Sequence, residues 1–251
     1  LFAGKYDIGV FPWSSVFKRM AANGETLRVF MGMEFRATLP VDAIVTRAEP
    51  GTRAKPAIKS LADLKGKRFG YPSQLRDYLK PLLININLAE EQVTLVEVPF
   101  SELVGRLDAG ELDAAWLLEP LICTLDTARF RVIQPAALPK FVSAPFPGAA
   151  VGFAPAMLDE SKVLLSRLQI ATDATISVSE TEGDRARQAL GRYFPYCSDV
   201  CGLCRIPELQ RLVEINRPAV SALADRLKTA GALENEVQTG DIFVQPAQLT
   251  R

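Results

Sequence analysis

The chain has 251 residues, of which 48% are hydrophobic, and its 29 Lys and Arg balance its 29 Asp and Glu. This length allows one large domain or two lobes with a full apolar core. The basic residues are scattered, which argues against a nucleic-acid-binding surface, and no apolar run approaches the length of a membrane span. The sequence contains no histidine, so Ser-His-Asp catalysis, Cys-His catalysis and His-ligated metal sites are excluded.

One short pattern occurs twice. Residues 1–10 and 107–116 both fit Leu-x-Ala-Gly-x-x-Asp, at an offset of 107 − 1 = 106 residues. Gly4 and Gly110 are expected to end helices, because glycine adopts the left-handed cap conformation without penalty. Leu1 then stands where a helix is already ending, so we expect an upstream strand and helix that the sequence does not contain.

Each copy of the pattern leads into the same order of elements. Apolar strands are predicted at Ile8–Phe11 and Ala114–Leu118, and each is followed by a polar turn, at residues 12–15 and 119–120. Ligands of α/β proteins sit beyond the carboxyl ends of such strands. The duplication therefore predicts two similar lobes whose turns face one cleft.

The other elements follow from periodicity and turn residues. Strands are predicted at 27–33, 41–46, 68–71, 93–98, 130–133 and 151–154, and helices at 12–22, from the turn at 72–74 to about 86, at 101–110, 119–127, 160–181, 183–194 and 207–230. Strands that alternate with helices predict an α/β fold with mainly parallel sheets.

Two proline-rich segments predict the lobe boundaries. Residues 49–56 hold two prolines, and residues 135–147 hold four. The predicted lobes are residues 1–46 with 148–251 and residues 52–144, with crossovers near 47–51 and 145–147.

Several segments together resemble a known family. Ser60–Gly70, which reads Ser-Leu-Ala-Asp-Leu-Lys-Gly-Lys-Arg-Phe-Gly, the stretch 107–120 ending in Glu-Pro, Leu1–Val10 and Leu227–Phe243 are similar to the nitrate/sulfonate/taurine-type substrate-binding proteins of ABC transporters. The resemblance implies a two-lobed type II periplasmic-binding-protein fold, a ligand enclosed between the lobes, an ABC permease as partner and an extracytoplasmic location. Similar motifs occur in enzymes on this scaffold, so they identify the fold better than the ligand.

Trp13, Ser14 and Ser15 follow the first copy of the pattern. As ligand residues, Trp13 would form an apolar wall, and the hydroxyls with the helix amides would donate to an anion. The alternative is a plain helix cap at Ser14 or Ser15, with Trp13 in the core.

Tyr71, Ser73, Gln74 and Arg76 occupy the corresponding turn of the second lobe. Ser73 and the first free amides of the following helix can hold a charged oxygen. Arg76 lies one turn into that helix, where it can instead face solvent.

Three further residues complete the predicted ligand site. Arg36, with Thr38 close by, can form a bidentate pair with a carboxylate or sulfonate, unless Arg36 is a surface charge or is bound to Glu34. Glu119 can accept a hydrogen bond from a ligand amine or hydroxyl, or it can only favour the start of a helix.

Cys197, Cys201 and Cys204 form a C-x3-C-x2-C pattern, and Cys123 stands alone in a predicted helix. The triad fits a metal site with an outside ligand, a disulfide with one free thiol, or unpaired thiols. Its spacing matches an iron–sulfur loop, but no barrel pattern follows, and we predict no cluster.

These observations predict a binding protein rather than an enzyme. We expect a small anionic organic ligand, no cofactor, no nucleic acid and a monomeric chain. The alternative is an enzyme on the same scaffold, such as a decarboxylase or a pyrimidine-synthesis protein, which needs a general acid or base in the cleft.

Overall fold

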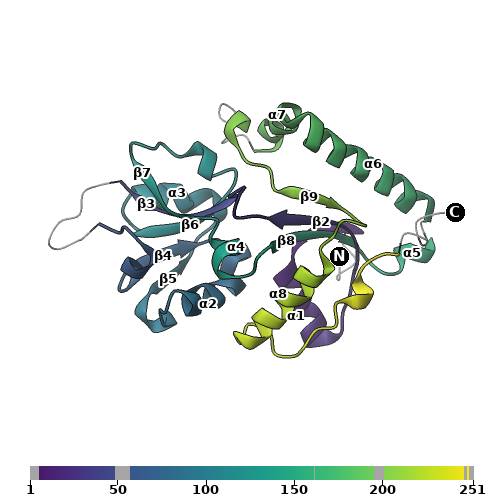
Figure 1. Cartoon of the computed structure of the whole chain (residues 1–251), viewed down its shortest axis with the longest axis horizontal. Helices are drawn as coiled ribbons and strands as arrows, with labels where there is room; N and C mark the ends of the chain where they lie inside the picture. The colour runs from purple at the N-terminus through teal and green to yellow at the C-terminus, as the bar shows by residue number, and fades with distance from the viewer. Residues whose placement is uncertain (1–5, 49–56, 161, 195–200, 246–247, 249–251) are drawn as a thin grey trace. The chain divides into compact units, whose positions relative to one another are not determined.

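A computed structural model describes residues 6–48, 57–160, 162–194, 201–245 and 248. The chain divides into two compact units (Figure 1). Unit 1 consists of residues 1–35, 145–186 and 207–251, and unit 2 consists of residues 36–144 and 187–206. Each unit is described separately below.

Unit 1 is built on a four-stranded sheet in the order β1-β8-β2-β9. The strands are β1 (Ile8–Pro12), β8 (Phe146–Phe153), β2 (Arg28–Phe35) and β9 (Glu208–Arg211), and every neighbouring pair is antiparallel. Helices α1 (Trp13–Asn23) and α8 (Arg217–Thr229) cover one face, and α6 (Lys162–Thr181) lies over the other (Figure 1). Short α5 (Met157–Glu160) leads into α6.

The α1 helix of unit 1 lies close to the predicted range 12–22, but its cap differs from the expected serines. It begins at Trp13, its N-cap is Pro12, and neither Ser14 nor Ser15 is the cap. Proline is well suited to this position because its ring fixes the backbone angle φ at a value compatible with the start of a helix. The cap prediction for the two serines is therefore wrong, and Gly24 ends the helix in the left-handed conformation.

Unit 2 is built on a five-stranded sheet in the order β5-β4-β6-β3-β7. The strands are β3 (Asp42–Arg47), β4 (Arg68–Tyr71), β5 (Thr94–Glu97), β6 (Ala114–Leu118) and β7 (Phe130–Pro135). β4 runs parallel to β5 and β6, whereas β3 runs antiparallel to β6 and β7. The helices are α2 (Arg76–Asn85), α3 (Leu103–Asp108) and α4 (Ala137–Phe141), with short 3-10 turns between elements.

Helix α3 covers one face of this sheet. Its Leu103 and Leu107 pack with Ala43 and Val45 of β3 in one buried cluster. Side chains alternate between the two faces of a strand, so Ile44 lies on the opposite face. Helix α3 ends at Asp108, and Gly110 follows two residues later with a φ of 73°, which confirms the predicted left-handed stop.

Strand β3 belongs to unit 2, whereas the prediction placed residues up to 46 in the first lobe. Its first five residues, from Asp42, are buried, and a central strand needs a hydrogen-bonding neighbour on each side. β6 and β7 supply those neighbours. The first unit boundary therefore falls between Phe35 and Arg36 rather than near 47–51, and the second falls between Ala144 and Pro145, next to the predicted 145–147.

Other local predictions also differ from the structure. The predicted helix at 119–127 is only a 3-10 turn, Ile122–Thr124. The predicted helix at 207–230 is β9 followed by α8, which starts at Arg217. Helix α7 (Gly183–Tyr193) crosses from the residues of unit 1 to those of unit 2, so residues 187–206 do not stay with the predicted first lobe.

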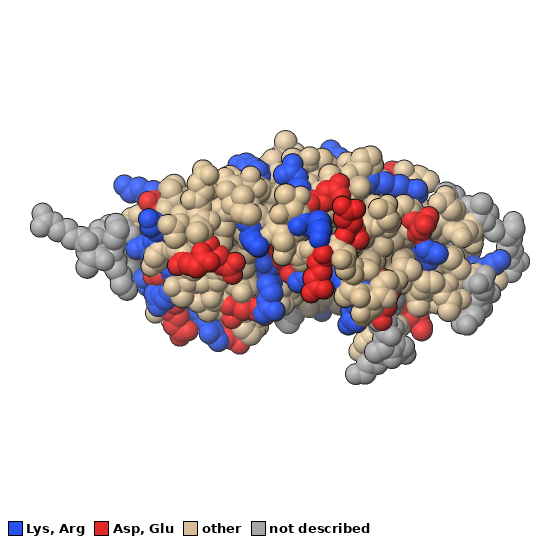
Figure 2. Space-filling view, turned by 90° about the horizontal axis from the view of Figure 1, so that it is seen from below, with Lys and Arg blue, Asp and Glu red and all other residues tan. Residues whose placement is uncertain are grey.

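The α/β class with mixed sheets is confirmed, but parallel pairing among the described strands is limited to β4 with β5 and β6. Among the described residues, no helix combines the length and apolar character that a membrane crossing requires. Lys and Arg side chains alternate with Asp and Glu over the visible surface, as the scattered charges of the sequence predict (Figure 2). Gly4 and the proline-rich segment 49–56 lie outside the described residues.

Candidate functional site

One edge of the unit 2 sheet gathers most of the predicted site residues. The parallel strands β4 and β6 are neighbours and end on the same side, with Tyr71 and Leu118 as their last residues. β3 runs in the opposite direction and begins there, since Asp42 pairs with Leu118. The amide of Glu119 donates to the carbonyl oxygen of Val41 at 2.9 Å. We call this edge the rim: it consists of the ends of β4 and β6, the residues that follow them, the residues that precede β3, and the side chains that contact these residues.

The β4 end of the rim carries four predicted residues. Tyr71 is buried, whereas Ser73, Gln74 and Arg76 are exposed. Ser73 starts a 3-10 turn, Ser73–Leu75, that continues directly into α2. The first amides of a helix have no acceptor within the helix, so Ser73 and Gln74 offer backbone as well as side-chain donors.

Arg76 is engaged within unit 2. Its guanidinium forms an ion pair with Glu97, the last residue of β5. The pKa of Arg76 is raised above its usual value, chiefly by the hydrogen bond to Glu97 and to a smaller extent by Tyr71. Because Arg76 is already paired with Glu97, its guanidinium is better suited to orienting neighbouring groups at the rim than to binding the ligand as a cation.

The segment before β3 brings Arg36 and Thr38 to the rim. Both residues are exposed, and the chain turns between them and β3: the Leu39 amide donates to the Arg36 carbonyl oxygen at 3.1 Å. The two residues therefore stand on a tight turn rather than on an extended loop.

Glu119 is half-buried at the β6 end of the rim. Its Oε2 accepts a hydrogen bond from the Cys123 amide at 3.0 Å, and its Oε1 accepts from the Arg205 amide at 3.5 Å. Burial raises the pKa of Glu119, and the two amides and the charge of Arg205 oppose that rise. Because residues 119–127 contain a 3-10 turn, Ile122–Thr124, rather than an α-helix, the Glu119 carboxylate stabilises this short turn and not the start of a helix.

Arg205 is a rim residue that the sequence reasoning missed. Its Nη1 lies 3.4 Å from the Pro40 carbonyl oxygen, and its amide faces Glu119. Residues 187–206 belong to unit 2, which brings this exposed cation to the same edge as Arg36. The sequence carries no local signal for it, because Arg205 is 86 residues from Glu119.

Trp13, Ser14 and Ser15 belong to unit 1. Trp13 is 1% exposed, and its ring stacks on Phe17 at 5.7 Å between centroids and contacts Phe243 at 6.0 Å. This is the core placement that the sequence left open as the alternative. Ser14 is buried and Ser15 is exposed, and a ligand role for the three stays a prediction.

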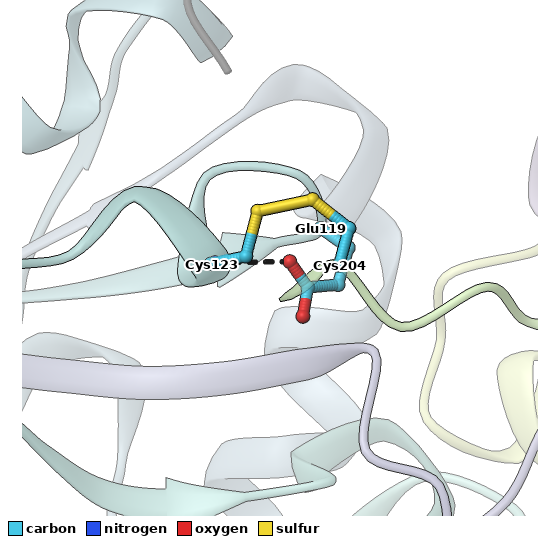
Figure 3. Close-up of side chains that lie close together, drawn as sticks. All are labelled: Glu119, Cys123 and Cys204. Carbon is cyan, nitrogen blue, oxygen red and sulfur yellow. Dashed lines mark hydrogen bonds between the residues drawn. A yellow bond between two sulfur atoms is a disulfide. The ribbon is translucent and has the colours of Figure 1, made fainter. Parts of the chain in front are cut away.

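The cysteines pair differently from the prediction. Cys123, expected to be a lone buried residue, forms a disulfide with Cys204, and no described cysteine is free (Figure 3). Cys201 and Cys204 are both 2% exposed and pack together with Cys123. Cys197 lies outside the described residues, so the predicted triad is not tested.

A separate hollow of about 300 Å³ lies in unit 1. It is lined by Lys18, Ala21, Ala22, Ala232, Leu233 and Glu234. None of the predicted site residues contributes to it. The predicted residues of unit 2 lie at the rim instead.

Residues 2–173 match the family model described as "NMT1/THI5 like". The chain belongs to the NMT1/THI5-like family. None of the curated proteins matches the chain.

Solved structures share the fold of this NMT1/THI5-like chain. The alkanesulfonate-binding protein SsuA from Xanthomonas axonopodis pv. citri, bound to MOPS, matches with a TM-score of 0.72 and 17% identity over 96% of this chain and 81% of that one. The periplasmic aliphatic sulphonate binding protein SsuA from Escherichia coli matches with a TM-score of 0.74 and 16% identity over 99% and 79%.

A third match is the Candida albicans CA3427 gene product, whose structure is described as the generic periplasmic binding protein fold. It has a TM-score of 0.65 and 13% identity over 94% of this chain and 76% of that one. The three matches establish the periplasmic-binding-protein fold for the NMT1/THI5-like chain.

The rim of this NMT1/THI5-like chain combines three kinds of group. Arg36 and Arg205 supply positive charge, Ser73 and Gln74 supply hydroxyl, amide and backbone donors, and Glu119 supplies an acceptor. Donors in excess of acceptors suit a ligand with negatively charged oxygens.

Proposed function

We propose that the chain is a solute-binding protein that captures a small anionic organic molecule and delivers it to an ABC permease. The solute class is a sulfonate, a nitrate-like ion or an aromatic or aliphatic carboxylate. The protein acts outside the cytoplasm as a monomer, without a cofactor.

The observation that carries this proposal is the set of donors on the unit 2 rim. Ser73 and Gln74 follow β4, and Arg36 precedes β3, so the topology of one sheet brings a guanidinium and helix-start amides to one edge. A bidentate guanidinium and free amides are the groups that recognise carboxylate and sulfonate oxygens.

The fold gives the proposal its second support. Two of the matched structures are described as binding proteins for alkanesulfonates or aliphatic sulphonates. A shared fold does not fix the ligand, so the solute class rests on the rim chemistry. Of the predicted residues in unit 1, Trp13 and Ser14 are buried and Ser15 is exposed, and a ligand role for them stays a prediction.

A thermal-shift screen tests the proposal directly. The probes are an aliphatic sulfonate, nitrate, an aromatic carboxylate and a pyrimidine, each with an uncharged analogue of the same size where one exists. A ligand that binds only the folded state raises the melting temperature, by an amount that grows with its concentration above Kd. We expect a shift with at least one anion and none with its uncharged analogue.

The enzyme alternative has its own outcome in the same screen. An enzyme would convert the stabilising compound to product during prolonged incubation, which mass spectrometry detects. Stabilisation without conversion supports a binding protein, and conversion supports the enzyme.

A further inference from the structure

Three potential metal ligands meet beside the rim in unit 2. A carboxylate oxygen of Glu119, Cys123 Sγ and Cys204 Sγ all lie within 4.8 Å of one another. Figure 3 shows the carboxylate of Glu119 next to the bond that joins the two sulfurs. We propose that Glu119, Cys123 and Cys204 form a zinc site that becomes available when the disulfide between the two cysteines is reduced.

The backbone holds the three residues in place independently of the disulfide. The Glu119 amide donates a hydrogen bond to the carbonyl oxygen of Val41, just before β3, and the Cys123 amide orients the Glu119 carboxylate. Cys204 closes a 3-10 turn, Cys201–Leu203, by donating its amide to the Cys201 carbonyl oxygen at 3.1 Å. The hydrogen bond to the Glu119 carboxylate fixes the direction of that ligand, and such bonds raise metal affinity.

The distances suit a tetrahedral ion. Zn–S bonds are about 2.3 Å and Zn–O bonds about 2.0–2.2 Å, so the ligand atoms around one zinc are separated by roughly 3.5–3.8 Å. The Cα atoms of Cys123 and Cys204 are 5.2 Å apart, so both sulfurs can reach one ion. Three protein ligands leave the fourth tetrahedral position for water.

The ligand set favours zinc over hard cations. Two thiolates are soft ligands that select zinc or similar metals, whereas Mg²⁺ and Ca²⁺ require oxygen ligands. The site is also largely shielded from solvent, since Cys204 is buried and Glu119 and Cys123 are half-buried. A buried pair of thiolates next to a carboxylate is a concentration of negative charge that a divalent cation would neutralise.

Reduction converts the disulfide into two metal-binding sulfurs. A dithiol reductant transfers two electrons and two protons to the Cys123–Cys204 bond, giving two thiols and the cyclic disulfide of the reductant. Zn²⁺ then binds both sulfurs and the Glu119 carboxylate, and the two thiol protons pass to solvent, because the thiolate is the metal ligand. Disulfides persist in oxidising compartments, so the zinc form belongs to reducing conditions.

The test compares the oxidised and the reduced 251-residue chain. The reduced protein is prepared with dithiothreitol under anaerobic conditions, freed of reductant, and titrated with Co²⁺ as a coloured substitute and then with Zn²⁺. We expect one equivalent of Co²⁺ to bind with a sulfur-to-cobalt charge-transfer absorption, Zn²⁺ to displace it, and the oxidised protein to show no such absorption.

Variants identify the ligands. Cys123→Ser and Cys204→Ser should abolish the charge-transfer absorption, and Glu119→Gln should weaken Co²⁺ binding about tenfold or more, in line with the loss on removing groups that support a metal site. Glu111→Gln removes an exposed carboxylate elsewhere in unit 2 and is the matched control, with affinity unchanged.

Three results would overturn the proposal. These are Co²⁺ binding without the sulfur absorption, equal binding by the oxidised chain, and unchanged affinity in Glu119→Gln. Circular dichroism of each reduced variant establishes that it is folded, and Glu119→Gln, which retains both cysteines, keeps the test decisive if a cysteine variant does not fold.

Discussion

Arg68 binds Asp113 through its side chain and its backbone at once. Its Nε and Nη2 lie 3.1 and 2.8 Å from the two carboxylate oxygens, and its amide donates to the same group at 2.8 Å. The same guanidinium also donates to the Gly110 carbonyl oxygen at 2.7 Å. Two segments that carry the family resemblance, Ser60–Gly70 and the stretch 107–120, are therefore joined by one ion pair at the start of β4 and β6.

Replacing Asp113 by Asn should lower the free energy of unfolding by about 1–2 kcal/mol, because hydrogen bonds to a charged group are lost at a partly exposed site. Burial alone would raise the pKa of Asp113, but the hydrogen bonds and charge of Arg68 lower it overall. The contribution is therefore present above the usual carboxyl pKa and is lost as the pH falls through the lowered value.

Urea denaturation at pH 7 and at acidic pH measures this effect. The matched control is Glu102→Gln, which breaks the exposed pair of Glu102 with Arg106 and should cost about 0.5 kcal/mol or less. Equal losses in Asp113→Asn and Glu102→Gln would contradict the role given to the Arg68–Asp113 pair.

Asp42 should make the chain less stable as the pH rises from acid to neutral. It is fully buried, and burial raises its pKa to about 6, although hydrogen bonds from Trp116 Nε1 at 3.0 Å and the Leu138 amide at 2.9 Å lower it. A folded-state pKa above the unfolded value of 3.8 gives stability that is complete below the unfolded pKa and is lost as the pH rises through about 6. The change is at most about 3 kcal/mol.

Denaturation curves between pH 4 and 7 for wild type and Asp42→Asn measure this change. The wild type should lose stability relative to the variant over that interval. Trp116→Phe removes the indole donor and should move the loss to higher pH. Parallel profiles for wild type and Asp42→Asn would show that Asp42 does not titrate in this range.

Two glycines at the ends of one segment should respond to alanine with opposite signs. Gly110 has a φ of 73°, and a Cβ there would lie 2.9 Å from Arg47 Nη1, so Gly110→Ala should cost about 1–2 kcal/mol. Gly105 lies inside α3 with no atom within 4 Å of the added Cβ, so Gly105→Ala should gain about 0.5–1 kcal/mol. Thermal unfolding followed by circular dichroism gives both signs, and a stabilising Gly110→Ala would contradict the cap.

The elements that could be predicted from the sequence are those with local causes. Ala114–Leu118 is an apolar run between Asp113 and Pro120, and its strand was predicted with the correct bounds. The placement of β3 was not predictable from the linker at 49–56, because its partners β6 and β7 are distant in sequence.

The candidate site also contains residues that local sequence predicts and residues whose place depends on contacts with distant segments. Ser73 and Glu119 are predicted as site residues because each lies just after a strand. Arg205 and the Cys123–Cys204 bond depend on contacts across 86 and 81 residues, and four cysteines allow several pairings that no sequence spacing decides. The core position of Trp13 depends on Phe243, which also comes from a distant segment.

Arg36→Ala should weaken the binding of an anionic solute by about tenfold or more, since a hydrogen bond to a charged group contributes roughly 1.5–3 kcal/mol. Ser73→Ala should cost less, because the backbone amides remain. Arg106→Ala removes an exposed guanidinium of α3 and should leave the affinity unchanged. Titration calorimetry with the anion found by screening measures all three, and an unchanged Kd in Arg36→Ala would remove Arg36 from the site.

The most direct test of the account is calorimetric titration of the purified wild-type chain with an aliphatic sulfonate, nitrate and an aromatic carboxylate. Each organic anion is paired with an uncharged analogue of the same size. We predict saturable binding of at least one anion with one site per chain, and no binding of the uncharged analogues. Absence of saturable binding by all three anions, or equal binding of an anion and its uncharged analogue, would contradict it.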